Sequence, residues 1–299
     1  NHKRNQTGDD LSDLLRSLDL HLRSRNRAAG TIVQYTGELT RFAAWLGVDR
    51  LDLSAVTKEQ LEGYFAHQFD MRLSAATVLY RYKGLQAVFR WHSRREGYVS
   101  PMLAVEPPSV PETQKDIVPL TEIRRVLRSL DRARRYRDGA IVSLLAETGI
   151  RVSELRSMDW SSIDWRTSTI TLEDTKNGEV RTVPFGPATG ERLDLWRTKR
   201  SDRSSPIVFA GQRGHRLDRS SIHRIVHRIF ADQGIPGIGP HDLRHTMATA
   251  YMDANPQGME DLKVVGGWKS DTMVRRYSKQ GAARRGVESF RKNNPLSAI

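Results

Sequence analysis

The chain has 299 residues and no cysteine, and 38% of its residues are hydrophobic while 28% are charged. This length predicts about two domains, each able to bury a core without disulfides. The composition excludes thiolate metal sites and cysteine nucleophiles. With no apolar run approaching about 18 residues and no signal peptide, the sequence predicts no membrane segment. The sequence begins at Asn1 rather than Met, which is typical of a trimmed chain or a fragment.

The charge is strongly positive, because 48 Lys and Arg residues against 35 Asp and Glu residues give a net charge of +13 at pH 7. Residues 1–110 hold 15 basic and 12 acidic side chains, and residues 111–299 hold 33 and 23. Such an arginine-rich chain favours a polyanionic partner, above all nucleic acid, because the guanidinium fork fits phosphate. The alternative is a soluble protein that is basic without such a partner.

Apolar residues at helical spacing predict four amphipathic helices in the first hundred residues. The first two cover residues 9–24 and 30–46, with Gly47 as a stop signal after the second. The third begins at Thr57, and the fourth covers residues 74–95. Four such helices with short joints predict a small helical bundle.

Five prolines between residues 101 and 119 interrupt the helical pattern and predict an extended linker. We place this linker at residues 106–118. The N-terminal domain is then residues 1–105, and the C-terminal domain is residues 119–299.

The C-terminal domain is predicted to be mostly α with a small antiparallel sheet. Residues 169–173 and 179–184 alternate as strands around Lys176-Asn177-Gly178, which is a hairpin signal. Helices are predicted at residues 121–130, 138–148, 189–200, 220–233, 241–253 and 259–265. The fold class is therefore mostly α, with a helical bundle followed by a mixed α+β domain.

Six side chains in four short motifs are candidates for chemistry. Taken singly, each has an ordinary explanation as a surface arginine, a turn lysine, a core or capping histidine, or a core aromatic residue. Their order and spacing along the chain are informative. They are Arg151 in TGIRVSEL, Lys176 in TKNG, His241 and Arg244 in HDLRH, and Trp268 and Tyr277 in GGWKSDTMVRRY.

These motifs, in this order, resemble the tyrosine site-specific recombinases of the phage integrase family, and the resemblance covers nearly the whole chain. It implies that Tyr277 is the nucleophile that attacks a DNA phosphodiester. It also implies that Arg151 and Arg244 clamp the non-bridging oxygens of the scissile phosphate. Two arginines oriented beforehand stabilise the charge that develops there without a metal ion.

The resemblance implies supporting roles for four further residues. Lys176 would protonate the leaving 5′-oxygen, and His241 would handle the tyrosine proton and help to hold the phosphate. Trp268 occupies a position that usually holds His, and it would contribute packing and one N–H donor. Glu154 matches an acidic position that supports the site.

No cofactor is predicted, because a phosphotyrosyl link conserves the energy of the broken bond and religation needs no ATP. His223 and His227 lie four residues apart, and His215 precedes them. The third ligand and the Glu of a zinc motif do not follow, so the sequence predicts no metal site.

The resemblance also implies partners. A core-binding bundle and a catalytic domain would clamp double-stranded DNA, with the linker crossing between them. The tail after Tyr277, with a short helix expected at residues 282–290, would dock on a neighbouring protomer to build a homo-tetramer on two DNA sites. An accessory directionality factor and a cytoplasmic, nucleoid-associated location of a bacterial or phage-encoded protein complete this expectation. The basic side chains expected to contact DNA are Arg23, Arg25, Arg27, Arg81, Lys83, Arg90, Arg94 and Arg95.

Several alternatives remain open at this point. The predicted bundle begins by about Asp9, so the compact form without an arm-binding domain is expected. The segment WKSDTMVRRYSK is more similar to phage or mobile-element integrases than to chromosome-dimer-resolution recombinases. A type IB topoisomerase would use the same chemistry without a specific site, and a DNA-binding regulator would keep the fold without the chemistry.

Overall fold

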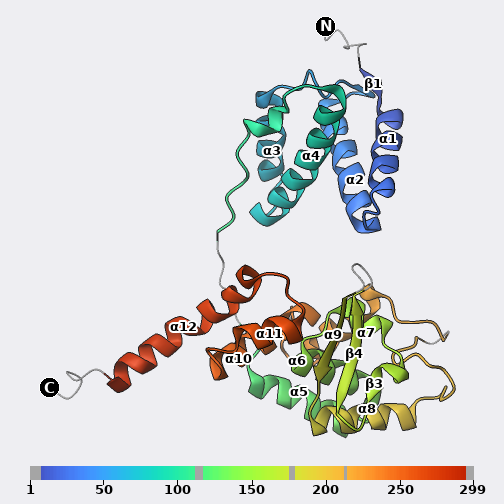
Figure 1. The fold of residues 1–299 in the computed structure, drawn as a ribbon, viewed down its shortest axis with the longest axis vertical. Helices are drawn as coiled ribbons and strands as arrows, with labels where there is room; N and C mark the ends of the chain where they lie inside the picture. Colours follow the sequence, from blue (N-terminus) through green and yellow to red (C-terminus); the bar gives the residue numbers. More distant parts are fainter. Residues whose placement is uncertain (1–7, 112–116, 175–178, 212–213, 294–299) are drawn as a thin grey trace. The chain divides into compact units, whose positions relative to one another are not determined.

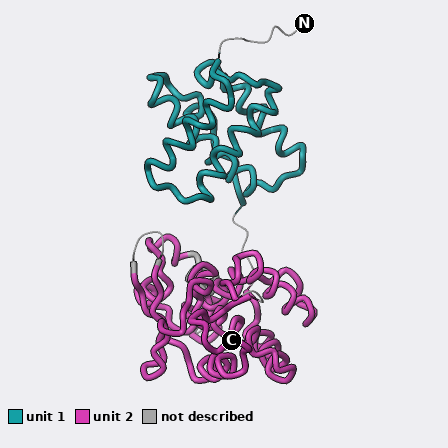
Figure 2. Tube along the Cα trace, turned by 90° about the vertical axis from the view of Figure 1, so that its right-hand side faces the viewer, with its two compact units in different colours: residues 1–113 teal, residues 114–299 magenta. Residues whose placement is uncertain are grey.

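The computed structural model describes residues 8–111, 117–174, 179–211 and 214–293. The chain divides into two compact units, residues 1–113 and residues 114–299 (Figure 2). Each unit buries its own hydrophobic core. Within the described residues, no helix combines the length and the apolar character that crossing a bilayer requires.

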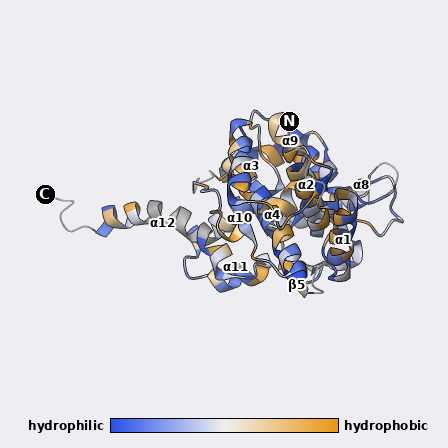
Figure 3. Cartoon of the chain, turned by 90° about the horizontal axis from the view of Figure 1, so that it is seen from above, coloured by the Kyte–Doolittle hydropathy of each residue, from blue (hydrophilic) through white to orange (hydrophobic). Residues whose placement is uncertain are grey.

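Unit 1 is a helical bundle in which α2 packs against α1 and α4, and α3 packs against α4. Hydrophobic and hydrophilic residues lie side by side on these helices (Figure 3), as expected of amphipathic elements with one buried face. Side chains of Asp10, Thr57 and Ser74 cap three of the four helix N-termini. The helices are α1 (Leu11–Ser24), α2 (Ala29–Leu46), α3 (Lys58–Asp70) and α4 (Ala75–Glu96) (Figure 1).

Unit 1 also contains three short elements that the sequence pattern does not reveal. Strands β1 (Asp9–Asp10) and β2 (Arg50–Leu51) pair antiparallel beside the bundle. A single 3-10 turn, η1 (Pro101–Leu103), opens the proline-rich segment and ends before the linker that we placed at residues 106–118. Two-residue strands are too short to show an alternating pattern, and a proline at the first position of a turn is compatible with helical geometry.

Unit 2 is built around α6 (Tyr136–Thr148), which is buried along most of its length. It packs against α5 (Leu120–Arg132), α8 (Pro187–Lys199), α9 (Arg219–Ala231) and α10 (Pro240–Ala254). The end of α6 is fixed by Gly149, whose φ of 59° provides the left-handed turn that ends the helix. Helix α7 (Val152–Ser157) begins three residues after Gly149.

A small antiparallel sheet completes the first part of unit 2, with strand order β3-β4-β5. The strands are β3 (Ile163–Asp164), β4 (Thr169–Asp174) and β5 (Glu179–Pro184). The predicted hairpin of β4 and β5 is confirmed, whereas β3 and the preceding turn η2 (Trp160–Ser162) were not predicted. In the hairpin register, Leu172 pairs with Arg181 and Ile170 pairs with Val183.

The C-terminal part differs from the expectation. Helix α11 (Met259–Gly266) is close to the predicted range, but α12 (Asp271–Asn293) is one helix of 23 residues that contains Tyr277. We expected only a short helix at residues 282–290. Its apolar residues are sparse, and Gly281 and Gly286 interrupt the pattern, so the sequence signal for a continuous helix is weak.

Candidate active site

The first candidate arginine lies at the junction between α6 and α7, as the sequence predicts. Arg151 is the residue before the first turn of α7, and its backbone N–H donates to Glu154 Oε2 at 2.6 Å. Its side chain returns to the same carboxylate, with Nη1 at 2.8 Å from Oε1. Glu154 is buried, so the carboxylate fixes both the start of α7 and the guanidinium of Arg151.

The second candidate arginine is on α10. Arg244 is buried, donates from Nη1 to the carbonyl of Gly149, and donates from Nη2 to the carbonyl of Gly266 at 2.7 Å. Burial, followed by the charges of Arg151 and Arg181, lowers the pKa of Arg244 to about 10, so the side chain stays protonated at neutral pH. A buried cation held by two backbone carbonyls is oriented before any ligand arrives.

His241 lies in the first turn of α10, three residues before Arg244. It is exposed, whereas Arg244 is buried. Both residues lie in α10 three positions apart, and therefore on the same side of the helix, although one is exposed and the other is buried.

Three arginines converge on the C-terminal end of α11. Arg181, on β5, donates from Nη1 to the carbonyl of Val265. Arg244 donates to the carbonyl of Gly266, and Arg151 donates from Nη2 to the carbonyl of Gly267. The last carbonyls of a helix have no partner within the helix and carry partial negative charge, so three consecutive oxygens anchor three guanidinium groups.

The aromatic candidates lie beside this cluster. The Trp268 ring centroid is 4.0 Å from Arg244 Cζ and 5.3 Å from the ring centroid of Tyr277. The ring of His245, to which the sequence assigned no role, meets Tyr277 edge-on at 5.2 Å and 71°. Tyr277 and Trp268 belong to a small hydrophobic cluster, here called the C-terminal cluster, formed by Ala248, Met252, Leu262, Trp268, Val274 and Tyr277.

Tyr277 itself is 1% exposed. It lies on α12 and is held by residues of α10, α11 and the segment between α11 and α12. The structure thus brings Arg151, Glu154, Arg244, Trp268 and Tyr277 into one connected set.

Lys176 lies outside the described residues. The strands on either side of it are described. Strand β5 packs against α11, and the carbonyls at the end of α11 accept hydrogen bonds from the three arginines.

A hollow of about 510 Å³ opens at this set of residues. Its lining carries four basic side chains and is therefore suited to an anion. The lining residues are Arg151, Val180, Arg181, Lys263, Val264, Gly267, Trp268 and Lys269. Within the described parts of the chain, no group of three histidine or acidic side chains has the arrangement of a metal site.

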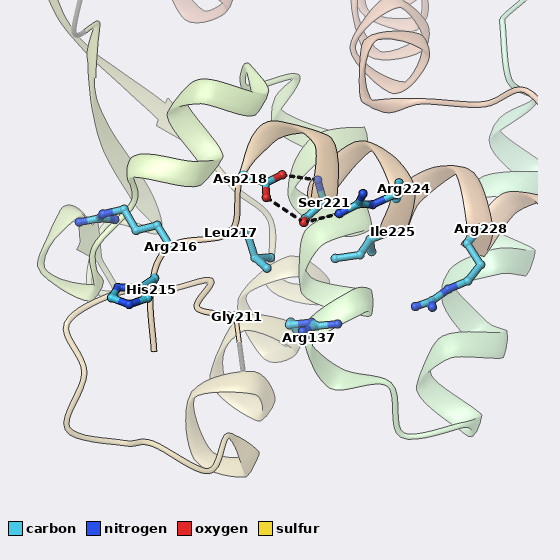
Figure 4. A pocket seen from close by; sticks show the side chains of 10 residues that line it. All are labelled: Arg137, Gly211, His215, Arg216, Leu217, Asp218, Ser221, Arg224, Ile225 and Arg228. Carbon is cyan, nitrogen blue, oxygen red and sulfur yellow. Dashed lines mark hydrogen bonds between the residues drawn. The ribbon is translucent and has the colours of Figure 1, made fainter. Parts of the chain in front are cut away.

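A second hollow in unit 2, of about 800 Å³, is also lined by basic residues but contains none of the candidates (Figure 4). Two of its arginines are engaged in ion pairs, as are Arg151, Arg181 and Lys263 in the smaller hollow, so ion pairing does not distinguish the two hollows. Arg216 Nη2 lies 2.9 Å from both carboxylate oxygens of Asp159, and Arg137 donates to Asp138. The smaller hollow is the candidate active site because Arg151, Arg181 and Trp268 all line it.

Sequence reasoning missed Arg181. Its side chain makes a fork with Glu154, with Nη2 at 2.7 Å from Oε2 and Nε at 3.3 Å from Oε1. A signal was present, because Arg181 lies two residues from the buried Val183, on the same face of the strand, and pairs with the buried Leu172 in the hairpin. An arginine on the buried face of a strand requires a polar partner in the interior.

The basic candidates of unit 1 do not form one surface. Arg23 is paired with Asp19 at 2.7 Å, and Arg81 donates to Gln68 at 3.2 Å. On α4, at about 100° per residue, Lys83, Arg90 and Arg94 fall within about 40° of one another, and all three are exposed. Arg81 points away from this group, while Arg25, Arg27 and Arg95 are exposed elsewhere on unit 1.

Known proteins resemble this chain in sequence and in fold. The sequence model of the phage integrase family matches residues 118–284. The tyrosine recombinase XerC of Mycobacterium tuberculosis strain H37Ra is 30% identical over 257 residues, which cover 80% of this chain and 83% of that protein. XerC of Mycobacterium sp. strain JLS is 29% identical over 272 residues, covering 85% and 89%.

Solved structures show the same fold at lower identity. The XerH recombinase bound to a palindromic difH substrate has a TM-score of 0.75 at 16% identity, covering 97% of this chain and 98% of that chain. A lambda integrase dimer bound to a COC′ core site has a TM-score of 0.71 at 21% identity, covering 90% and 77%.

Proposed function

This chain belongs to the phage integrase family and is a site-specific tyrosine recombinase, and on that premise we propose that Tyr277 forms its phosphotyrosyl link to DNA. The observation that carries this assignment is the convergence of three arginines on the end of α11, beside the contact between Trp268 and Tyr277. Cationic donors and a tyrosine in one place suit attack on a phosphodiester.

The proposed reaction transfers a phosphoryl group between two oxygens. The Tyr277 hydroxyl oxygen attacks the scissile phosphorus, a bond between phosphorus and Tyr277 oxygen forms, and the bond to the 5′-oxygen breaks. His241 takes the tyrosine proton, and Lys176 gives a proton to the leaving 5′-oxygen. Religation is the reverse reaction with a new 5′-hydroxyl, so no cofactor is consumed.

Arg151 and Arg244 are proposed to stabilise the charge on the non-bridging oxygens. Each guanidinium has five N–H groups. In the structure, two of these groups on each arginine hold Glu154 or backbone carbonyls, and the remaining groups are proposed to bind phosphate. Trp268 would keep Arg244 and Tyr277 in place by contact with both, and Glu154 would hold Arg151.

Duplex DNA is the proposed substrate of both units. The DNA-bound XerH and lambda integrase structures share the fold of this chain, which supports unit 1 as the core-binding domain and unit 2 as the catalytic domain. The exposed group Lys83, Arg90 and Arg94 on α4 is the part of unit 1 best suited to contact the DNA backbone. A homo-tetramer on two sites, an accessory directionality factor and a cytoplasmic, nucleoid-associated location remain parts of this proposal.

Two subtypes are supported by different observations. The XerC relatives favour a chromosome-dimer-resolution recombinase, whereas the terminal motif favours a phage or mobile-element integrase. The position of the DNA target site distinguishes the two subtypes. A single site on the host chromosome indicates a chromosome-dimer-resolution recombinase, and a site at the end of an inserted element indicates an integrase.

The test is covalent trapping. The protein is incubated with genomic DNA of its source, denatured, and the DNA that remains attached is sequenced. We expect adducts at one or two discrete sites for the wild type and none for Tyr277→Phe, because this substitution keeps the ring and removes the attacking hydroxyl. Tyr277→Phe should still bind DNA.

Each other outcome contradicts a part of the proposal. Adducts formed by Tyr277→Phe would remove Tyr277 as the nucleophile. Scattered wild-type adducts would indicate a topoisomerase, and tight binding without any adduct would indicate a DNA-binding regulator.

A further inference from the structure

We propose that Arg181 is a positioning residue for strand cleavage: it shares the Glu154 carboxylate with Arg151 and so keeps the Arg151 guanidinium oriented and its charge available to the scissile phosphate. This inference rests on the proposed function, and it adds a third arginine to the two that the sequence motifs supply. Three observations support it: both arginines hydrogen-bond to the Glu154 carboxylate, two positive charges share its one negative charge, and both side chains pack against Gly267.

The Glu154 carboxylate is divided between two arginines. Its Oε1 accepts from Arg151 Nη1 at 2.8 Å and from Arg181 Nε at 3.3 Å. Its Oε2 accepts from the Arg151 backbone N–H at 2.6 Å and from Arg181 Nη2 at 2.7 Å. The Glu154 side chain is 5% exposed and the Arg181 side chain 13%, whereas the Arg151 side chain is 35% exposed. Both arginines line the hollow, and Arg181 is the more buried of the two.

The charge balance explains why a second arginine is needed. With Arg151 alone, the buried carboxylate would neutralise the charge of that guanidinium and draw its donors inward. With Arg181 present, one negative charge is shared by two positive ones, and the set keeps a net positive charge toward the hollow. Buried charges interact more strongly than exposed ones because water and salt screen them less.

Packing fixes the relative position of the two guanidiniums. A Cβ on Gly267 would lie 2.8 Å from Arg181 Nε and 3.1 Å from Arg151 Nη1, so both side chains rest on the same glycine. Arg181 also donates to the carbonyl of Val265, and Arg151 to that of Gly267. A change at Arg181 is thus transmitted to Arg151 through Glu154 and through the end of α11.

The experiment measures single-turnover cleavage of a nicked duplex that carries the site recovered by covalent trapping, together with DNA affinity and melting temperature. Arg181→Met should lower the cleavage rate about 10–100-fold, as is common for residues that orient a reacting group, and should change DNA affinity by less than about threefold. Arg181→Lys keeps the charge but loses the fork, so its rate should fall between those of the wild type and Arg181→Met.

The matched control is Arg192→Met. Arg192 on α8 makes the same kind of fork, with Asp131 at 3.0 Å and 2.7 Å, away from the candidate site. We expect it to lower the melting temperature and to leave the cleavage rate unchanged. If Arg181→Met behaves like this control, Arg181 is only a structural ion pair and the inference is wrong. If Arg181→Met fails to fold, Arg181→Lys decides: a wild-type rate overturns the inference.

A double-mutant cycle with Glu154→Gln tests the charge argument. When the carboxylate charge is removed, Arg181 has nothing to neutralise, so Arg181→Met should lower the rate of Glu154→Gln by less than about threefold. Independent, multiplicative losses would refute the coupling. A wild-type protein that forms no adduct refutes the proposed function itself, whereas a wild type that cleaves beside equally active Arg181 variants refutes only this inference.

Discussion

At the scale of single residues, Gly267 has the most demanding position in the site. Its φ is 65°, in the left-handed region that favours glycine, and it ends α11. The guanidiniums of Arg151 and Arg181 occupy the space that a side chain would fill. Glycine is therefore required there for two separate reasons, one conformational and one steric.

These two reasons can be separated by substitution. Gly267→Ala should lower stability by about 1–2 kcal/mol through the left-handed backbone and should also lower the cleavage rate at least about tenfold by displacing the arginines. Gly234→Ala is the control, because Gly234 has a φ of 78° and open space around its Cβ position. It should lower stability by a similar amount with a normal cleavage rate. Equal cleavage rates of the two variants in single-turnover assays would contradict the steric argument.

The predictability of the site varied residue by residue. Arg151 and Glu154 were predictable because a glycine stop followed by a helix start fixes their local geometry. The partner of Arg181 was not predictable, because Glu154 is 27 residues away in the chain and no local pattern joins them. The exposure of His241 beside the buried Arg244 also depends on packing that spacing alone does not specify.

At the scale of elements, α12 differs most from the sequence prediction. It carries Tyr277 near its start, and farther along it exposes Val287 and Phe290, which are 54% and 69% accessible. Residues three apart lie on the same side of a helix, so these two form an apolar spot. Most of the other described helices were predictable because each buries a regular apolar stripe in one core, whereas α12 buries Val274 and Tyr277 near its start and exposes Val287 and Phe290 farther along.

Deletion of residues 282–299 should leave DNA binding and single-site cleavage intact and should lower recombination between two sites at least about tenfold, because the tail is proposed to join protomers. The double substitution Val287→Ser and Phe290→Ser should have the same effect without shortening the chain. Val33→Ser in unit 1, where Val33 is 71% exposed, is the control for loss of a surface apolar residue. Recombination at the wild-type rate after the deletion would exclude the proposed role of the tail.

At the scale of the whole molecule, positive charge is the property that sequence alone predicted most directly. Both units are positively charged, and residues 111–299 hold most of the excess. The mostly α class was also predictable from the helical periodicity of apolar residues. The division near the proline-rich segment was predictable from the change in composition there. The tertiary contacts that make the site, from α6 to α12, were not, because they join residues far apart in the chain.

Binding of the full chain to duplex DNA should depend steeply on salt. If it neutralises about 6–10 phosphates, its affinity should fall by about 10³–10⁵ between about 50 and 200 mM salt, because each contact releases counterions. Titrations at several salt concentrations measure the slope. A slope near zero would be incompatible with DNA as the substrate.

The burial of Tyr277 has a kinetic consequence. A hydroxyl on a residue that is 1% exposed meets a DNA phosphate only after the C-terminal cluster loosens, so an opening equilibrium precedes the chemical step. The observed rate is then the product of the open fraction and the intrinsic rate, and about 1.4 kcal/mol of packing around Tyr277 corresponds to a tenfold slower enzyme. Stability and speed are therefore opposed in this part of the molecule. With Tyr277 as the proposed nucleophile, this opposition limits unwanted cleavage, because the attacking hydroxyl stays buried most of the time.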